Sequence, residues 1–213
     1  MTELTQRGGP ALPGSRRRVD VDSDLEDLAQ GVADQVASFL LAVRAIARGS
    51  EPGTTIPLLL LEVSQLLLAG ARLGVMTDLV PREQYEPEAG PDPDLDRIRE
   101  ALAALLGPAD EYIEVFDPYA DPPELVPARI SDDVAAIAER LAHGLAHHRD
   151  GRVDEALWWW QFSYVSSWGS EASAVLRALQ SVVAHDRLDE DGPDTAEMER
   201  IAVAEQIAGR PTA

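Results

Sequence analysis

The sequence lacks cysteine altogether, and all 18 of its basic residues are arginine. Without thiols the chain can form no disulfide, no thiolate metal site, no iron–sulfur cluster and no cysteine nucleophile. Without lysine it can carry neither a Schiff base nor a Walker-type phosphate loop. These two absences exclude many catalytic chemistries before any motif is considered.

Basic and aromatic residues are also scarce. The 213 residues include 18 arginines against 38 acidic residues, for a formal net charge of −20 at pH 7, and aromatic residues make up 5% of the chain. Duplex DNA and anionic membranes both select proteins with clustered cations. We therefore expect neither a nucleic acid nor a membrane as a partner.

No apolar run is clean enough for a membrane span or a secretion signal. The longest run, 56–73, is interrupted by Glu62, Gln65 and Arg72, and it is slightly shorter than the ~20 residues that cross a bilayer. Residues 1–22 are rich in glycine, proline and arginine but have no apolar stretch after the arginines, which a signal peptide needs. We predict a disordered segment over 1–22, a buried helix within 56–73 and a cytoplasmic protein.

Apolar residues recur at three- and four-residue intervals along most of the chain, which predicts amphipathic helices. The clearest stripe lies in the segment 23–48 and consists of Leu25, Leu28, Val32, Val36, Phe39, Val43 and Ile46. Glycines, prolines and capping residues delimit the other helices. The six predicted helices span 23–48, 54–74, 93–106, 131–149, 153–168 and 171–188.

The segment 108–130 has the weakest pattern. Its apolar residues around Tyr112 and Phe116 suggest a short helix that the following prolines must end. No segment is predicted to be a strand. We therefore predict an all-α fold, a single-domain bundle of about six helices over 23–188, followed by an acidic tail over 189–213 with a short C-terminal helix.

Acidic residues gather in one part of the chain. Residues 86–133 contain fourteen acids against three arginines. Turn residues and helix caps on a solvated face account for such a run. A docking surface for a basic partner is the functional alternative, and both interpretations stay open. The alternating acids at 92–96 lack the glycine and the twelfth-position glutamate of a calcium loop, so we predict no calcium site.

Two histidines have the spacing of metal ligands. His143 and His147 stand four residues apart, which places two imidazoles on one helix face, as many zinc sites require. Measured around the helix from Leu141, they lie at about 200° and 240°, away from the apolar stripe. We predict a surface pair and no metal site, without deciding whether the pair ever binds metal. His148 falls within the stripe and is predicted to be a hydrogen-bonded core histidine.

Glu62, Gln65 and Arg72 form a narrow polar strip on an otherwise apolar helix. The strip is either the thin exposed edge of a central helix or the polar lining of an internal cleft. In the second case, a cleft between the helices 54–74 and 153–168 would place Glu62 and Arg72 together with Gln161 and His148 as candidate ligand-binding residues.

The segment 153–168 holds all four tryptophans of the chain, together with Phe162 and Tyr164. A helix that is aromatic on nearly every side either forms the centre of the bundle or carries an interface. Core packing is the first interpretation. Trp158, Trp159 and Phe162 are the candidate partner-binding residues, because they lie outside the main apolar stripe. The serines of this helix lack a nucleophile elbow, so we predict no catalytic residue.

Several of these motifs together resemble one family. They are FLLAVR at 39–44, LLEVSQLLLAG at 60–70, EVFDPY at 114–119, HGLAH at 143–147, and EALWWWQFSY at 155–164 followed by Trp168 and Gly169. Over about 24–188 the chain is similar to the actinobacterial domain-of-unknown-function 5063 family. The resemblance implies an uncharacterised, helical, cytoplasmic protein, and it brings no activity, cofactor or catalytic residue with it.

Two hypotheses about function follow from these observations. The first is a non-catalytic interaction module that binds a protein partner, of basic character, through the aromatic helix, the acidic surface or both. The alternative is an enzyme or small-ligand-binding protein that uses the polar cleft. No cofactor is predicted in either case, and the oligomeric state stays open.

Overall fold

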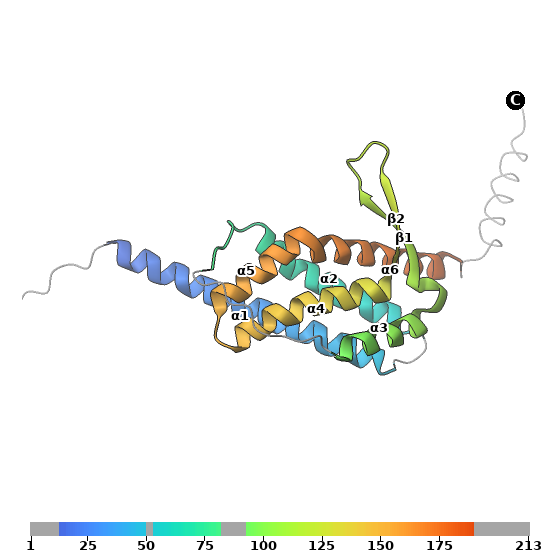
Figure 1. Cartoon of the computed structure of the whole chain (residues 1–213), viewed down its shortest axis with the longest axis horizontal. Helices are drawn as coiled ribbons and strands as arrows, with labels where there is room; N and C mark the ends of the chain where they lie inside the picture. The colour runs from blue at the N-terminus through green and yellow to red at the C-terminus, as the bar shows by residue number, and fades with distance from the viewer. Residues whose placement is uncertain (1–12, 50–52, 82–92, 190–213) are drawn as a thin grey trace, which may run out of the picture.

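The computed structural model describes residues 13–49, 53–81 and 93–189 of the chain. These residues form a mostly helical bundle from which a β-hairpin projects (Figure 1). The elements, in chain order, are α1 (Pro13–Ala47), α2 (Thr55–Gly74), α3 (Pro93–Leu106), the 3-10 helix η1 (Gly107–Asp110), β1 (Glu111–Asp117), β2 (Glu124–Arg129), α4 (Ile130–Arg149), α5 (Val153–Ser163), the π-helix η2 (Tyr164–Trp168) and α6 (Gly169–Asp189).

Most helix boundaries agree with the sequence prediction. α2 begins at Thr55, next to the expected cap, and α3 begins at Pro93 and ends just before Gly107. Gly107 has a φ of 53°, a conformation in which a side chain would be strained, and this explains why the helix ends at a glycine. α4 begins one residue earlier than predicted.

The start of α1 corrects the predicted disordered segment over 1–22. The helix begins at Pro13, so residues 13–22 are helical. Proline is favoured in the first turn of a helix, and residues 15–22 contain neither proline nor glycine to stop it. The rest of that segment, 1–12, lies outside the described residues, as do 190–213, where the short C-terminal helix was predicted.

The predicted break at Gly169 is absent, which corrects the count of six helices. α5, η2 and α6 run on without interruption, so the described residues form five continuous helices. Gly169 has helical dihedral angles. A Cβ atom there would collide with the backbone oxygen and ring of Tyr164, so this glycine permits the π-turn and does not end the helix.

A two-stranded sheet corrects the all-α prediction. β1 and β2 pair antiparallel, with Tyr112 opposite Ala128 and Val115 opposite Leu125, and the register shifts between Val115 and Asp117. Side chains in β1 alternate between exposed and half-buried as far as Val115, the period-2 pattern of a strand. The prolines that were expected to end a helix, Pro118, Pro122 and Pro123, lie between the two strands.

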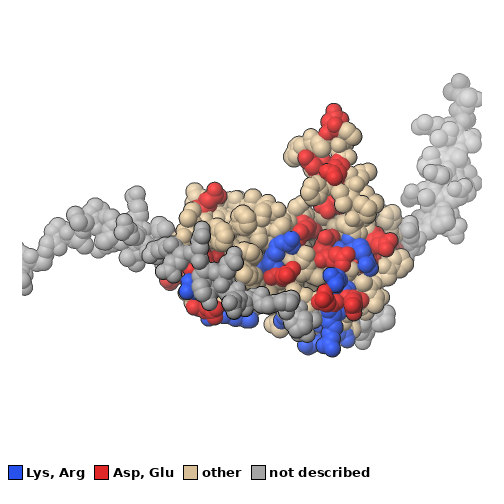
Figure 2. Space-filling view, viewed as in Figure 1, with Lys and Arg blue, Asp and Glu red and all other residues tan. Residues whose placement is uncertain are grey.

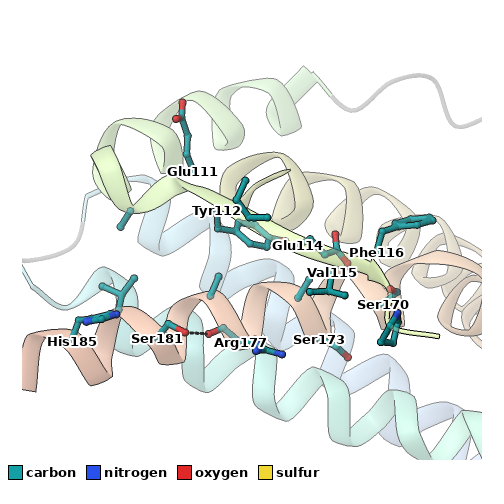
Figure 3. Close-up of a pocket in the computed structure, with 16 residues that line it drawn as sticks. Glu111, Tyr112, Glu114, Val115, Phe116, Ser170, Ser173, Arg177, Ser181 and His185 are labelled. Carbon is teal, nitrogen blue, oxygen red and sulfur yellow. Dashed lines mark hydrogen bonds between the residues drawn. The ribbon is translucent and has the colours of Figure 1, made fainter. Parts of the chain in front are cut away.

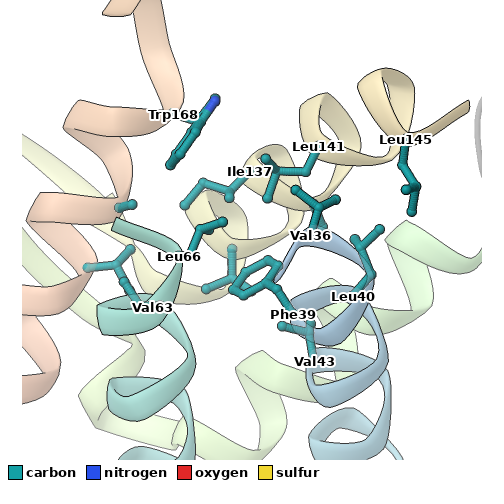
Figure 4. Close-up of a cluster of buried hydrophobic side chains, with 14 of the residues drawn as sticks. Val36, Phe39, Leu40, Val43, Val63, Leu66, Ile137, Leu141, Leu145 and Trp168 are labelled. Atoms are coloured by element: carbon teal, nitrogen blue, oxygen red, sulfur yellow. The ribbon is translucent and has the colours of Figure 1, made fainter. Parts of the chain in front are cut away.

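The core lies between the helices of the bundle, and α1 to α6 all contribute to it (Figure 4). It contains Val36, Phe39 and Val43 of the predicted α1 stripe, together with Val63 and Leu66 from α2 and Ile137 and Leu141 from α4. Burying such side chains contributes about 1.5–3 kcal/mol each. α4 contacts α1, α3, α5 and α6 and is therefore a central element of the bundle.

α2 is less buried than its composition predicted. Leu58, Leu61 and Leu68 are exposed on its outer side, while Leu59, Val63 and Leu66 pack into the core. By length and composition, α2 could cross a membrane, and one third of its most apolar window is buried inside the bundle. Core helices of soluble proteins pass the same test, so this feature does not decide where the protein resides.

Candidate functional site

Two of the four tryptophans belong to the core. Trp160 and Trp168 are fully buried. The indole N–H of Trp160 donates to the carbonyl of Leu141, at 3.2 Å, and that of Trp168 donates to the carbonyl of Trp160, at 3.3 Å. Their polar atoms are thus satisfied within the bundle. The serines nearby donate to carbonyls four residues earlier in the helix, as with Ser163 to Trp159 at 2.6 Å, so they are not available nucleophiles.

The three aromatic residues predicted to bind a partner have different environments. Trp159 is half-buried against α4, where its indole N–H donates to the carbonyl of Arg140 at 2.8 Å and its ring packs on His143 at a centroid distance of 4.2 Å. Trp158 is half-buried and stacks on Phe162, which is 53% exposed. Phe162 is therefore the accessible member of the three, whereas Trp159 joins two helices.

The histidine pair is not on the surface, which corrects that prediction. His147 is buried and His143 half-buried, with 3.3 Å between their Nε2 atoms. α5 covers this side of α4, which a single apolar stripe on α4 could not indicate. Burial, together with the neighbouring His143, lowers the pKa of His147. Within the described residues, no group of three or more metal-binding side chains is arranged around an ion site.

Gln161 connects the segment after α2 to α5. Its side-chain amide donates to the carbonyls of Leu73 and Thr77, at 3.1 and 3.2 Å, and its oxygen accepts from the backbone N–H of Leu79 at 2.8 Å. Three of its four hydrogen-bonding positions are therefore occupied by backbone. Gln161 anchors residues 73–79, which leaves it little capacity to bind a ligand.

The other three predicted cleft residues have different surroundings. Arg72 is exposed in a shallow hollow between α1 and α2, about 15 Å along the helix axis from Glu62. Glu62 is half-buried, has one buried oxygen without a hydrogen-bond partner and has a pKa raised by burial. His148 is half-buried beside Trp160, at a centroid distance of 6.0 Å. Glu62 and Arg72 thus lie on separate parts of α2, and the Gln161 amide is already bonded to backbone, so this arrangement gives no support to a shared ligand-binding cleft.

A buried carboxylate holds the base of the hairpin. Asp110 is 1% exposed and accepts hydrogen bonds from the backbone N–H and the hydroxyl of Ser131, at 2.8 and 2.9 Å. It also forms an ion pair with Arg129, at 2.9 Å. Asp110 precedes β1, Arg129 ends β2 and Ser131 lies in the first turn of α4. One carboxylate therefore closes the hairpin and satisfies the start of α4.

Beyond this base, the hairpin exposes apolar and acidic side chains together. The exposed fractions are 63% for Ile113, 40% for Val115, 61% for Phe116, 96% for Tyr119 and 64% for Leu125. The exposed acidic residues are Glu111, Asp117, Asp121 and Glu124. We call these nine residues the hairpin surface. Figure 2 shows acidic side chains along the projection and a mixture of acids and arginines at its foot.

The face of the hairpin turned toward the bundle has a cluster of acids. The Tyr112 hydroxyl donates to Asp133 at 2.8 Å, and Glu171 of α6 pairs with Arg140 at 3.0 Å. Burial raises the pKa of Asp133, the hydrogen bond from Tyr112 lowers it, and the nearby carboxylates of Glu171 and Glu114 raise it, so that the pKa lies at about 6. The pKa values of Glu114 and Glu171 are also raised, chiefly by burial.

This cluster predicts a pH dependence of stability. The pKa of Asp133 lies near 6 in the folded protein, against a usual value of 3.8, so between these values the folded state binds more protons than the unfolded state. The contribution of Asp133 to stability therefore decreases as the pH rises through this window. We expect Asp133→Asn to gain stability relative to wild type as the pH rises from about 4.5 to about 7.5.

Thermal denaturation of both proteins at the two pH values measures this effect. The asparagine can still accept the hydrogen bond from Tyr112, so the comparison isolates the ionisation. The raised pKa of Asp133 would be contradicted if the difference in melting temperature between the two proteins did not change with pH. It would also be contradicted if the wild type gained stability relative to Asp133→Asn at the higher pH.

The sequence analysis identified the acidity of this region but not the hairpin. The available signal was the composition of residues 112–116, which is rich in aromatic and β-branched residues. No sequence pattern indicated the roles of the carboxylates of Asp110 and Asp133. Asp110 and Asp133 acquire their roles from Ser131 and Tyr112, about twenty residues away in the sequence.

The fold and these surfaces define a mostly helical domain with a projecting acidic hairpin. The model of the family described as "Domain of unknown function (DUF5063)" matches residues 23–185. The chain belongs to this family, as its motifs indicated. The crystal structure of protein BF1032 from Bacteroides fragilis has a similar fold, with a TM-score of 0.58 and 19% sequence identity over 71% of this chain and 89% of that chain. No curated protein matches the chain.

Proposed function

We propose that the protein is a non-catalytic interaction module that binds a basic protein partner through the hairpin surface. We also propose that it acts in the cytoplasm and comes from an actinobacterium, as the sequence motifs imply. The sequence analysis gave two candidate binding surfaces, the aromatic helix and the acidic segment, and the proposal selects the acidic segment. The acidic segment provides the contact, while most of the tryptophan-rich helix supports the bundle.

The observation that carries this proposal is the exposure of the hairpin's large apolar residues. Ile113, Phe116 and Leu125 are each more than 60% exposed on an element that stands out from the bundle (Figure 1). A two-stranded hairpin is at best marginally stable without support from further elements. Contiguous apolar residues rimmed by charge are typical of protein-binding sites. A partner that covers this surface would supply the missing packing.

Charge indicates the character of the partner. Residues 110–133 contain eight acidic residues and one arginine. Bringing an acidic partner to this surface would place like charges together at a cost, whereas a basic partner is attracted over a distance of several Å. The polar cleft of the alternative hypothesis receives no comparable support, because Gln161 is bonded to backbone and Glu62 and Arg72 lie about 15 Å apart along α2.

A triple variant tests the proposal. We expect Asp117→Asn, Asp121→Asn and Glu124→Gln together to reduce the capture of a protein partner from native cell extract, since they remove three negative charges from the exposed end of the hairpin. The matched control is Asp24→Asn, Glu26→Gln and Asp27→Asn, which removes three exposed charges from α1. The captured protein is then purified, and its affinity is measured at increasing salt.

The expected result is that the wild type and the α1 variant bind alike and that the hairpin variant binds more weakly, with a smaller salt dependence. If all three proteins capture the same set with the same affinity, the hairpin surface is not the binding site.

A further inference from the structure

A groove of about 610 Å³ runs between β1 and α6 (Figure 3). One wall is β1, which contributes every residue from Glu111 to Phe116, and the other is α6, from Ser170 to His185. The groove is lined by β1 and α6 but by no residue of β2, which places it along the edge of β1 opposite to β2.

That edge is open for pairing. Within the described part of the chain, β1 pairs with β2 alone, so its outer N–H and C=O groups are not used in a ladder. β1 contains no proline over its seven residues. β2 contains Pro127, which lacks an N–H, and proline in a strand interrupts the edge that faces away from the partner. The hairpin therefore has one edge suited to accept a strand, and it is the edge beside the groove.

The opposite wall leaves room for a strand. Ser170, Ser173, Ala174 and Ala178 are small, and they lie at helical spacing along the side of α6 that lines the groove. A third strand would run ~4.8 Å from β1 and would place alternate side chains over these residues. The length of β1, about 23 Å at ~3.3 Å per residue, sets the length of the segment at roughly seven residues.

The two faces of β1 determine the side chains that such a strand needs. Ile113 and Val115 lie on the outer face, so the neighbouring positions of an added strand favour apolar residues. Glu114 lies half-buried on the inner face, in electrostatic contact with Glu171 and Asp133. An arginine or lysine beside Glu114 would compensate for these acids. Arg177, the arginine in the groove, is exposed and can turn toward solvent.

The geometry points to β-strand addition: an extended segment of the partner, with alternating apolar and basic residues, binds as a third strand along the open edge of β1 in the groove against α6. This inference rests on the proposed function, because it names the part of the basic partner that binds. It adds that backbone hydrogen bonds to β1 hold the segment, in addition to charge.

A synthetic peptide of about nine residues, with alternating arginine and valine, is the probe. In a strand, the amides of alternate residues point to the same edge. Methylating the nitrogens of all the valines therefore blocks one edge, and methylating those of all the arginines blocks the other. Both peptides keep the charge and side chains of the parent.

We expect the parent peptide to bind and to protect β1 amides from hydrogen exchange. One of the two methylated peptides should lose about tenfold or more in affinity while the other stays close to the parent, because only one set of amides faces β1. In the protein, Ser173→Trp should fill the groove and abolish binding. The control Gln180→Trp, exposed on α6 outside the groove, should bind as the wild type does.

Three outcomes would overturn strand addition: no binding of the parent peptide, an equal effect of both methylations, or binding that survives Ser173→Trp. None of these outcomes contradicts the proposed function, provided that the hairpin triple variant still binds the basic partner more weakly than the wild type does. Conversely, if that triple variant binds its partner normally while the peptide behaves as expected, the groove accepts strands but the acids of the hairpin do not select the partner.

Discussion

Trp160→Ala is expected to lower the free energy of unfolding by about 3–5 kcal/mol, because it removes a fully buried indole from between α4 and α5. The substitution creates a large cavity and leaves the carbonyl of Leu141 without its 3.2 Å hydrogen bond. The neighbouring main chain is shaped to this ring. A Cβ atom on Gly144 would collide with the Trp160 indole, so the helices approach closely only with glycine at that position.

Urea denaturation followed by circular dichroism measures this loss. The control is Trp158→Ala on the same helix, where the side chain is half-buried and a loss of about 1 kcal/mol is expected. Gly144→Ala should also destabilise the protein, by about 1–3 kcal/mol, because the rigid indole must move. Equal effects at Trp158 and Trp160 would show that Trp160 is not the packing centre of this interface.

Asp110→Asn is expected to lower the free energy of unfolding by about 1.5–3 kcal/mol, the range for hydrogen bonds to a charged group. The asparagine has nearly the same shape, but it removes the charge that pairs with Arg129, and its amide hydrogens face other donors. The effect should extend beyond global stability. Because Asp110 ties the start of β1 to the end of β2 and to Ser131, the hairpin amides should exchange faster with solvent.

Urea denaturation and amide hydrogen exchange measure the two effects. The control is Asp96→Asn, which removes an exposed carboxylate paired with Arg99 at 2.7 Å and should cost about 0–1 kcal/mol. If Asp110→Asn and Asp96→Asn have the same effect, or if hairpin exchange does not change, Asp110 does not hold the hairpin.

The apolar pattern of a single helix did not reliably predict which of its side chains are exposed and which are buried. Trp159 was a candidate partner-binding residue because it lies outside the main apolar stripe of its helix, but α4 covers that side as well. His147 was predicted to be exposed for the same reason and is buried. A helix that contacts neighbours on several sides buries residues all round, and one sequence does not reveal how many neighbours a helix has.

The sequence by itself determined the helical content, the boundaries of α2, α3 and α4, the α1 stripe through Phe39, the acidity of the segment before α4 and the family. These properties follow from periodicity, caps and composition, which act within a few residues of one another. Tertiary structure alone decided that the acidic segment forms a hairpin, that Gly169 continues a helix, and that Asp110 joins Arg129 and Ser131. Each of these depends on atoms that meet only after the chain has folded, and the apolar residues of 112–116 form a strand through pairing with β2 across the turn.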